Sequence, residues 1–277
     1  MKQLMIIAGC FLAMLSFAQE TERASTALPN VKVLETPLQI PGLNRSRTLR
    51  LYLPPGYEKG NERYPVLYMH DAQNLFDDVT SFVGEWGVDE AMNELSTSHG
   101  LNVIVVGIDN GQQYRNTELS AWPNERLGGD PEGKAYMDFV VNVVKPYIDK
   151  HYRTQSDREH TAIMGSSLGG LISHYGIYAH PEVFSRAGIF SPSYWVSEDV
   201  FSFTRENPLP QDSRLYLTVG KKEGPILVEP TEKMYRFILN EGHPADHIIE
   251  KTVAEGRHNE QFWGSVFKEA VMWLFQK

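Results

Sequence analysis

A serine flanked by glycines is the part of the sequence that most directly indicates chemistry. Residues 165–169 read GSSLG, which places Ser167 at the centre of a G-x-S-x-G pattern. The apolar stretch 160–164 precedes this pattern and an amphipathic stretch, 168–178, follows it, so we predict a strand, a sharp turn and a helix. Such a turn lifts the serine hydroxyl above a sheet, where it can attack a carbonyl carbon. The sequence therefore predicts a nucleophile at Ser167.

Two alternatives accompany this interpretation. Ser166 is a neighbouring hydroxyl that lies off the centre of the pattern, and a glycine-rich turn without chemistry could contain the same residues. We expect Gly165 and Gly169 to be glycines because a side chain at either position would collide with neighbouring backbone. The N-terminus of the following helix would favour a developing negative charge beside the serine.

The serine hydroxyl needs a base that takes its proton. His258 follows an apolar stretch, 248–254, and precedes a helical pattern that starts at Asn259, so we place it on a loop at the carboxyl end of a strand. His243 and His247 come before the same strand and therefore lie at its other end. The sequence predicts His258 as the base, and an ordinary loop histidine is the alternative.

The base in turn needs an acid that fixes its tautomer and stabilises its cation. In hydrolases that use this serine turn, the acid lies between the serine and the histidine in the chain. Glu223 follows the apolar stretch 215–219 within a short glycine-containing loop, which is the position that this order requires. Glu198 and Asp199 are the other candidates, and a solvated loop charge is the alternative interpretation of Glu223.

The tetrahedral oxyanion of acyl transfer needs two backbone N–H donors. The residue after the nucleophile, Leu168, supplies one of them. The second is expected from the loop 70–74, HDAQN, which follows the apolar stretch 65–69. Because a backbone donor requires no particular side chain, the residue types leave the donor within this loop open.

The elements that must position these groups follow from the hydrophobic pattern. Alternating stretches at 31–34 and 47–53 predict half-buried antiparallel strands. Continuous apolar runs predict strands covered on both faces, at 65–69, 103–108, 160–164, 187–190, 215–219 and 248–254. Helical patterns separate them, at 86–95, 136–150, 168–178, 231–240 and 259–275. This alternation predicts an α/β fold, a three-layer sandwich whose central sheet is mostly parallel, with antiparallel N-terminal strands.

The N-terminal segment has the pattern of a secretory signal. Residues 1–18 contain Lys2, an apolar run and a small-residue site ending at Ala18, so we expect export to the periplasm or the extracellular space. An uncleaved anchor helix and a lipoprotein signal that modifies Cys10 are alternatives. Residues 19–30 are polar and predict a flexible lead-in, and 31–277 shows no linker, which indicates a single domain.

Composition excludes several classes of function. The chain has 26 Lys and Arg residues against 35 Asp and Glu, a formal net charge of −9, which argues against nucleic acid as a partner. Cys10 is the only cysteine, and no metal-ligand cluster or nucleotide-binding loop is present in the sequence, so we predict neither a metal nor another cofactor. We also expect no stable membrane insertion once the signal is removed, and the sequence does not indicate an oligomeric state.

Several blocks of sequence together resemble one family. The segments YPVLYMHDAQNLF, GSSLGGLISHYG, VGKKEG and RHNEQFW are similar to the branch of the α/β-hydrolases that contains esterase D, enterochelin esterases, feruloyl and acetylxylan esterases, and mycolyltransferases. The resemblance runs from about Arg47 to Phe275 and implies an α/β-hydrolase fold. It places the family's nucleophile, acid and histidine on Ser167, Glu223 and His258.

The same resemblance suggests further site residues. It places the second oxyanion amide on Gln73, although this chain reads Asp-Ala where the family often has Asp-Gly. It also suggests that Trp86 and Trp195 border the substrate cleft, with Trp122 or Trp263 as further candidates. Packing in the core is the alternative for each tryptophan.

These observations predict a secreted serine ester hydrolase that works through an acyl-enzyme. Acetyl or feruloyl esters of carbohydrates, as small molecules or oligosaccharides, are the first expectation for its substrate. A siderophore trilactone or acyl transfer to a sugar is the alternative within the family. A non-catalytic carbohydrate-binding protein on the same fold is the alternative of another class. We expect the loops 109–135 and 193–212 to build the pocket.

Overall fold

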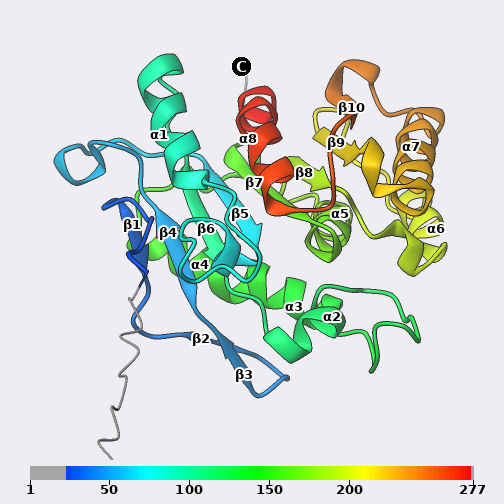
Figure 1. The fold of residues 1–277 in the computed structure, drawn as a ribbon, viewed down its shortest axis with the longest axis horizontal. Coiled ribbons are helices and arrows are strands. Elements are labelled where there is room, and N and C mark those ends of the chain that lie inside the picture. Colours follow the sequence, from blue (N-terminus) through cyan, green and yellow to red (C-terminus); the bar gives the residue numbers. More distant parts are fainter. Residues whose placement is uncertain (1–22, 276–277) are drawn as a thin grey trace, which may run out of the picture.

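The computed structural model describes residues 23–275, and an eight-stranded mixed sheet organises this part of the chain. Its strand order is β1-β4-β6-β5-β7-β8-β9-β10 (Figure 1). The strands are β1 (Val31–Val33), β4 (Leu49–Tyr52), β5 (Val66–His70), β6 (Ile104–Ile108), β7 (Thr161–Ser166), β8 (Arg186–Phe190), β9 (Arg214–Gly220) and β10 (Ile248–Val253). The pairs β1–β4 and β4–β6 are antiparallel, and the other neighbours are parallel. The prediction of a mostly parallel sheet with antiparallel N-terminal strands is confirmed.

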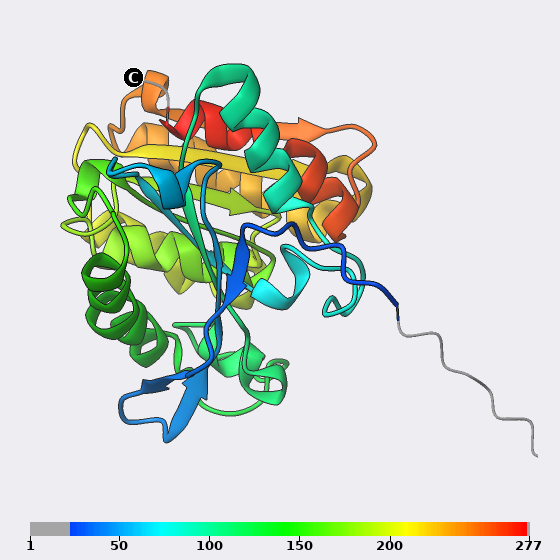
Figure 2. The same ribbon diagram turned by 90° about the vertical axis from the view of Figure 1, so that its left-hand side faces the viewer.

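Helices cover both faces of this sheet (Figure 2). One face packs against α1 (Val88–His99) and α8 (Glu260–Phe275). The other packs against α3 (Gly133–Phe139), α4 (Lys145–His151), α5 (Leu168–Ala179), α6 (Asp199–Glu206) and α7 (Pro225–Asn240). Because successive side chains of a strand point to opposite faces, Leu67 belongs to the core that includes α1 and α8, whereas Tyr68 belongs to the core that includes α3 to α7.

Some elements differ from the prediction. The predicted helix at 136–150 is three consecutive segments, α3, a π-helical turn at Val140–Val144 and α4. Three elements were not predicted from the sequence: the hairpin of β2 (Leu38–Ile40) and β3 (Arg45–Arg47), the short α2 (Arg115–Glu118) and α6.

The N-terminal segment is described only in part. The signal peptide at 1–18, with Cys10, lies outside the described residues. Residues 23–30 are described and are bonded to the body of the protein, for example through Asn30 Nδ2, which donates to the carbonyl of Leu53 at 2.8 Å. The flexible lead-in at 19–30 stays a prediction, and these bonds show where its described part lies against the body of the protein. In the described part of the chain, no helix is both long and apolar enough to cross a membrane.

Candidate active site

The turn between β7 and α5 has the geometry that a serine nucleophile requires. Ser167 has φ 58° and ψ −120°, a region that non-glycine residues rarely adopt, and α5 begins at the next residue. Its N–H donates to the carbonyl of Phe190 on the neighbouring strand at 2.9 Å. This bond helps to hold a strained residue at the carboxyl end of the sheet, where ligands bind in α/β folds.

The glycines around this turn differ in whether the structure requires glycine at their position. A Cβ atom at Gly165 would lie 2.7 Å from the backbone of Gly169, so the expected collision is present there. At Gly169 the nearest atoms would be side-chain atoms at 3.4 and 3.5 Å, and our prediction of a backbone collision at that position is wrong. Gly170 carries that constraint instead, because its Cβ would lie 2.7 Å from the carbonyl oxygen of Phe190.

Glu223 and His258 are brought into direct contact. Glu223 ends a 3₁₀ turn, Lys221–Glu223, that follows β9, and its Oε2 lies 2.6 Å from His258 Nδ1. The Glu223 side chain is 0 % exposed, and its Oε1 accepts hydrogen bonds from the N–H of Gly220 and the hydroxyl of Ser191, both at 2.7 Å. A carboxylate can only accept at this distance, so Nδ1 carries the proton and Nε2 of His258 is left as the acceptor.

The alternative acids lie elsewhere. Glu198 and Asp199 are exposed at the start of α6, and Glu198 is paired with Lys233 at 2.7 Å. Of the three carboxylates considered from the sequence, only Glu223 contacts His258.

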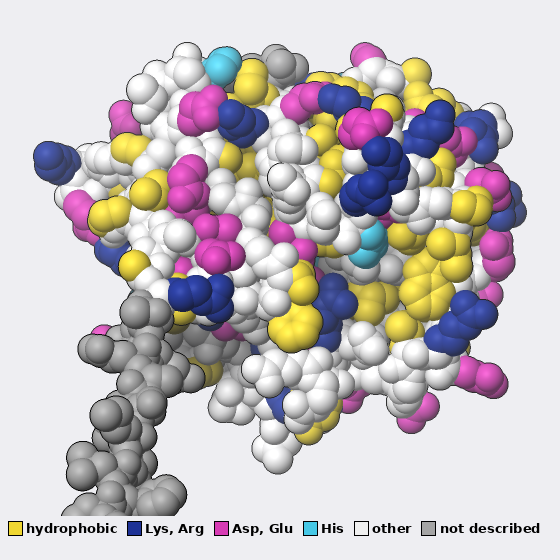
Figure 3. All heavy atoms as spheres, in the orientation of Figure 1, with side chains coloured by type: hydrophobic (Ala, Val, Ile, Leu, Met, Phe, Trp, Pro, Cys, Tyr) yellow, Lys and Arg dark blue, Asp and Glu magenta, His cyan; other side chains and the backbone are white. Residues whose placement is uncertain are grey.

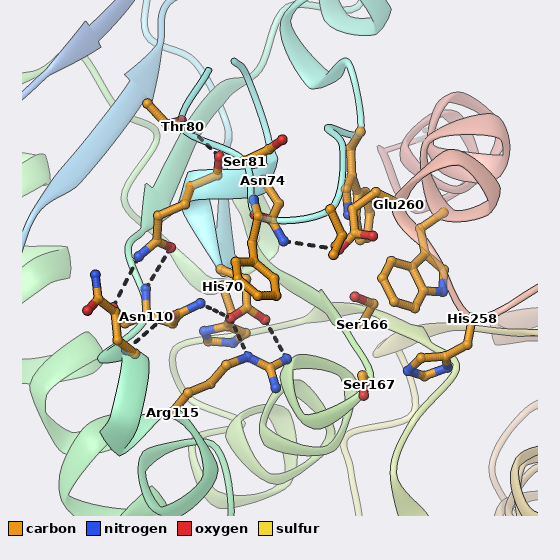
Figure 4. A pocket seen from close by; sticks show the side chains of 17 residues that line it. His70, Asn74, Thr80, Ser81, Asn110, Arg115, Ser166, Ser167, His258 and Glu260 are labelled. Atoms are coloured by element: carbon orange, nitrogen blue, oxygen red, sulfur yellow. Dashed lines mark hydrogen bonds and ion pairs between the residues drawn. The ribbon is translucent and has the colours of Figure 1, made fainter. Parts of the chain in front are cut away.

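Ser167 and His258 line the same cleft and lie on the same side of it (Figure 4). The nearest hydrogen-bonding side chain to Ser167 Oγ is Ser193, whose Oγ lies 3.4 Å away. Within the described residues, the Ser167 hydroxyl and the His258 imidazole are not hydrogen bonded. Without substrate, catalytic hydrogen bonds are often long and shorten when the substrate binds.

Two residues that were not predicted to contact Glu223 and His258 lie against them. Trp263 Nε1 donates to Ser191 Oγ at 2.8 Å, and Ser191 donates to Glu223. The indole of Trp263 also stands edge-on to the imidazole of His258, with ring centroids 4.9 Å apart. Trp263 thus contacts His258 directly and is connected to Glu223 through the hydroxyl of Ser191. Trp263 was a candidate for the cleft wall, but no sequence signal marks Ser191.

The loop after β5 lies beside the serine turn. Asp71 adopts a left-handed conformation, φ 57° and ψ 46°, and a 3₁₀ turn, Ala72–Asn74, follows it. The Gln73 side chain is bonded to the backbone of Asn110 in both directions, at 3.0 and 3.2 Å. Leu168 is the first residue of α5, where a backbone N–H has no acceptor within the helix. The two segments that we expect to bind the oxyanion therefore meet at neighbouring strand ends.

An ion pair between the half-buried Arg115 and the buried Asp71 fixes this loop. Arg115 donates from Nε and Nη2 to the two carboxylate oxygens of Asp71, at 2.7 and 2.9 Å, and Asn110 Nδ2 adds a third bond at 2.7 Å. Burial acts to raise the pKa of Asp71, but the charge and hydrogen bonds of Arg115 outweigh it and lower that pKa below its usual value. Asp71 is thus a charged residue that structures the loop.

The cleft has a volume of about 770 Å³. Trp86 and Trp263 line it, and Trp86 is 7 % exposed and stacked on Phe190. Trp195 does not line it, because it lies on the turn after Ser193 with its side chain half-buried against the larger core cluster. The expectation for Trp195 is therefore not supported by this cleft.

The walls of the cleft also differ from the expectation. Residues from 110–115 contribute, but none of 193–212 lines the cleft, and the loop after β5 contributes Gln73, Asn74 and residues 80–83 instead. Exposed hydrophobic side chains interrupt the polar surface on this side of the molecule (Figure 3). Within the described residues, no group of three or more His, Cys, Asp or Glu side chains could hold a metal ion.

The fold and the strained serine turn are those of an α/β-hydrolase. A comparison with family models matches residues 40–274 to the family described as "Putative esterase". The chain belongs to this esterase family, and it is a carboxylic ester hydrolase of the serine-hydrolase type.

Three curated relatives share a quarter or less of their aligned residues with this chain. An uncharacterized protein of Bacillus subtilis, YbbA, is 24 % identical over 84 % of this chain and 94 % of its own. An endo-1,4-beta-xylanase/feruloyl esterase of Xylanibacter ruminicola is 22 % identical, with the match covering 84 % of this chain but 30 % of that protein. The ferri-bacillibactin esterase BesA of Bacillus subtilis is 23 % identical over 65 % of this chain and 68 % of its own.

Solved structures share the fold. The siderophore hydrolase EstA of Aspergillus nidulans superposes with a TM-score of 0.72 at 16 % identity, covering 88 % of this chain and 94 % of that one. A ferulic acid esterase superposes with a TM-score of 0.67 at 21 % identity, covering 88 % and 98 %.

Proposed function

We propose that this protein is an exported serine esterase whose catalytic triad is Ser167, Glu223 and His258. The observation that carries the proposal is the contact between His258 and the fully buried Glu223 in the cleft that also contains Ser167 on its strained turn. Export is inferred from the signal pattern of residues 1–18.

In the proposed reaction, Ser167 Oγ attacks the ester carbonyl carbon while His258 Nε2 takes the hydroxyl proton. Glu223 stabilises the imidazolium that forms. The backbone N–H groups of Leu168 and Gln73 donate to the oxyanion of the tetrahedral intermediate. Collapse of the intermediate breaks the C–O bond, and Nε2 returns the proton to the leaving alcohol. Water then attacks the acyl-enzyme in the same way and releases the acid.

For the substrate, we propose acyl esters of carbohydrates, with acetyl or feruloyl as the acyl group. The aromatic wall of the cleft, from Trp86 and Trp263, supports a planar group, and the bifunctional xylanase relative carries feruloyl esterase in its name. The siderophore trilactone is a second candidate, which the similarity to BesA favours.

The first test is hydrolysis of p-nitrophenyl acetate by the chain from residue 19, compared with Ser167→Ala. Loss of the nucleophile is expected to lower kcat by roughly 10⁴ to 10⁶. Ser166→Ala is the matched control, because it removes the adjacent hydroxyl of the same cleft, and its kcat should fall far less. Equal slow rates for wild type and Ser167→Ala would favour a carbohydrate-binding protein without catalysis.

The second test is a substrate panel of acetylated xylan, methyl ferulate and a catecholate trilactone. We expect the highest kcat/KM for one of the first two. A clear preference for the trilactone would overturn the substrate proposal while leaving the triad intact.

A further inference from the structure

The N-terminal segment of residues 23–28 lies against a loop more than fifty residues away in the chain. Ser25 Oγ donates to Asp77 Oδ2 at 2.7 Å, and the backbone N–H of Thr26 donates to Asp77 Oδ1 at 3.2 Å. Arg23 pairs with the neighbouring Asp78 at 3.5 Å. These bonds fix the beginning of the loop that runs from residue 77 to residue 85, which we call the rim loop.

Thr26 connects the two ends of the rim loop. Its hydroxyl donates to Glu85 Oε1 at 2.7 Å and accepts the backbone N–H of Asp78 at 2.8 Å. Two residues later, the N–H of Leu28 donates to the buried carboxylate of Asp89 at 2.8 Å, next to the rim loop at the start of α1. A single hydroxyl thus bridges positions 78 and 85.

The rim loop forms one wall of the cleft. Thr80, Ser81, Phe82 and Val83 line the cleft, and Phe82 is 91 % and Val83 60 % exposed. Two such exposed apolar side chains at the mouth of a cleft are available to a ligand. Figure 4 shows Thr80 and Ser81 on the side of the cleft opposite His258.

The rim loop is also bonded to the turn that we expect to bind the oxyanion. Thr80 Oγ1 donates to the carbonyl of Gln73 at 2.9 Å, and the N–H of Phe82 donates to Asn74 Oδ1 at 3.1 Å. The rim loop is therefore held on one side by residues 23–28 and on the other by the 72–74 turn.

We propose that residues 23–28 are a strap that positions the rim loop so that Phe82 and Val83 bind an aromatic group of the ester, with Thr26 as the main positioning residue. This inference rests on the proposed function, because it assigns part of the substrate to that cleft. A loop without regular structure would lose conformational freedom on binding, and the strap removes part of this cost before the substrate arrives.

The first experiment measures hydrogen exchange of the rim loop in the chain from residue 19. Thr26→Val keeps the shape of the side chain but removes the hydroxyl. It should speed amide exchange in residues 77–85 by at least about tenfold, because the hydroxyl makes two hydrogen bonds to this loop. Thr26→Ser should restore protection. Thr97→Val is the matched control, because Thr97 is exposed on α1 and bonds only the carbonyl of Asn93 in its own helix. Unchanged exchange in Thr26→Val would overturn the strap.

The second experiment measures the Kd of methyl ferulate by titration calorimetry in a Ser167→Ala background, so that it does not depend on turnover. Thr26→Val and Phe82→Ala should each raise this Kd about fivefold, and Thr26→Ser and Thr97→Val should not. In the active enzyme, the same change should appear in KM for methyl ferulate, with kcat within about twofold and little change for ethyl acetate. Faster exchange without any change in Kd would overturn the assignment of the rim loop to the substrate. Failure of the proposed function would appear separately, as equal turnover by wild type and Ser167→Ala.

Discussion

The substitution Glu223→Gln tests the assignment of the acid with almost no change in shape. The wild-type carboxylate accepts three hydrogen bonds, from His258 Nδ1, the N–H of Gly220 and the hydroxyl of Ser191. Glutamine offers one acceptor oxygen and one NH₂ group, so it cannot satisfy three donors. Either orientation of the amide therefore leaves a mismatch.

The first orientation keeps the oxygen on Gly220 and Ser191 and turns the NH₂ toward His258. Nδ1 must then accept, Nε2 carries the proton, and the Ser167 hydroxyl loses its proton acceptor. Loss of the correct tautomer in a serine triad lowers kcat by about 10⁴. The second orientation keeps the tautomer but places the NH₂ against two buried donors, at a cost of about 1–3 kcal/mol for each unsatisfied group. We expect the first orientation, because the N–H of Gly220 and the hydroxyl of Ser191 both keep their acceptor.

The assay is kcat for p-nitrophenyl acetate, with Asp199→Asn as the control because Asp199 is an exposed acid that was a candidate from the sequence. Glu223→Gln should lose about 10⁴ in kcat and Asp199→Asn less than about twofold. A loss below about tenfold for Glu223→Gln, or a larger loss for Asp199→Asn, would refute the reasoning.

Four further predictions concern Trp263, the glycines after Ser167, Asp89 and dependence on a metal. Trp263→Phe removes the donor to Ser191 while keeping an aromatic ring, so kcat should fall about tenfold, the effect of roughly one hydrogen bond, measured beside the wild type under saturating ester. Gly170→Ala should lower the free energy of unfolding in urea by about 1–3 kcal/mol because its Cβ would meet a carbonyl of β8, whereas Gly169→Ala, with only side chains at 3.4 Å or more, should be neutral or stabilising. Burial raises the pKa of Asp89 to about 7, so the native state binds this proton more tightly than the unfolded chain. Its contribution to stability is present below pH 4 and is lost as the pH rises to about 7. Asp89→Asn should therefore flatten the fall in unfolding free energy between about pH 4 and pH 7, by at most about 4 kcal/mol, and an equal slope in both proteins would contradict this. Dialysis against EDTA should leave kcat unchanged, and a loss restored by a divalent ion would show that a metal takes part.

The buried strands could be predicted because their apolar runs are continuous, and a sheet covered on both faces requires such runs. The β2–β3 hairpin could not, because β3 reads Arg-Ser-Arg. Arg47 in that strand is buried against Glu118, a partner that is 71 residues away. A local pattern describes an arginine as exposed unless the distant carboxylate is known.

The site shows the same limit. Residue types and strand ends were enough to predict that Glu223 would contact His258 and that Ser167 would share a cleft with this histidine, because the proposed chemistry requires a hydroxyl, a carboxylate and an imidazole in that order. They were not enough for Trp195, because a tryptophan next to a turn can face the cleft or the core, and packing decides which. Ser191 was missed for the opposite reason. A serine carries no signal of its own, and its role depends on the Trp263 indole and the Glu223 carboxylate that meet its hydroxyl.

The strand order explains why residues distant in sequence form one network. In the sheet, β7, β8, β9 and β10 are consecutive neighbours, and they are followed in the same order by Ser167, Ser191, Glu223 and His258. Each of these four residues therefore lies one strand away from the next, and the parallel register sets their spacing. Trp263 joins from α8, which packs on β8 and β9 and starts immediately after the histidine loop. A histidine on the loop after β10 can be held between Glu223 and Trp263 only if α8 returns over these two strands. The same helix that completes one core layer thus also fixes the orientation of His258.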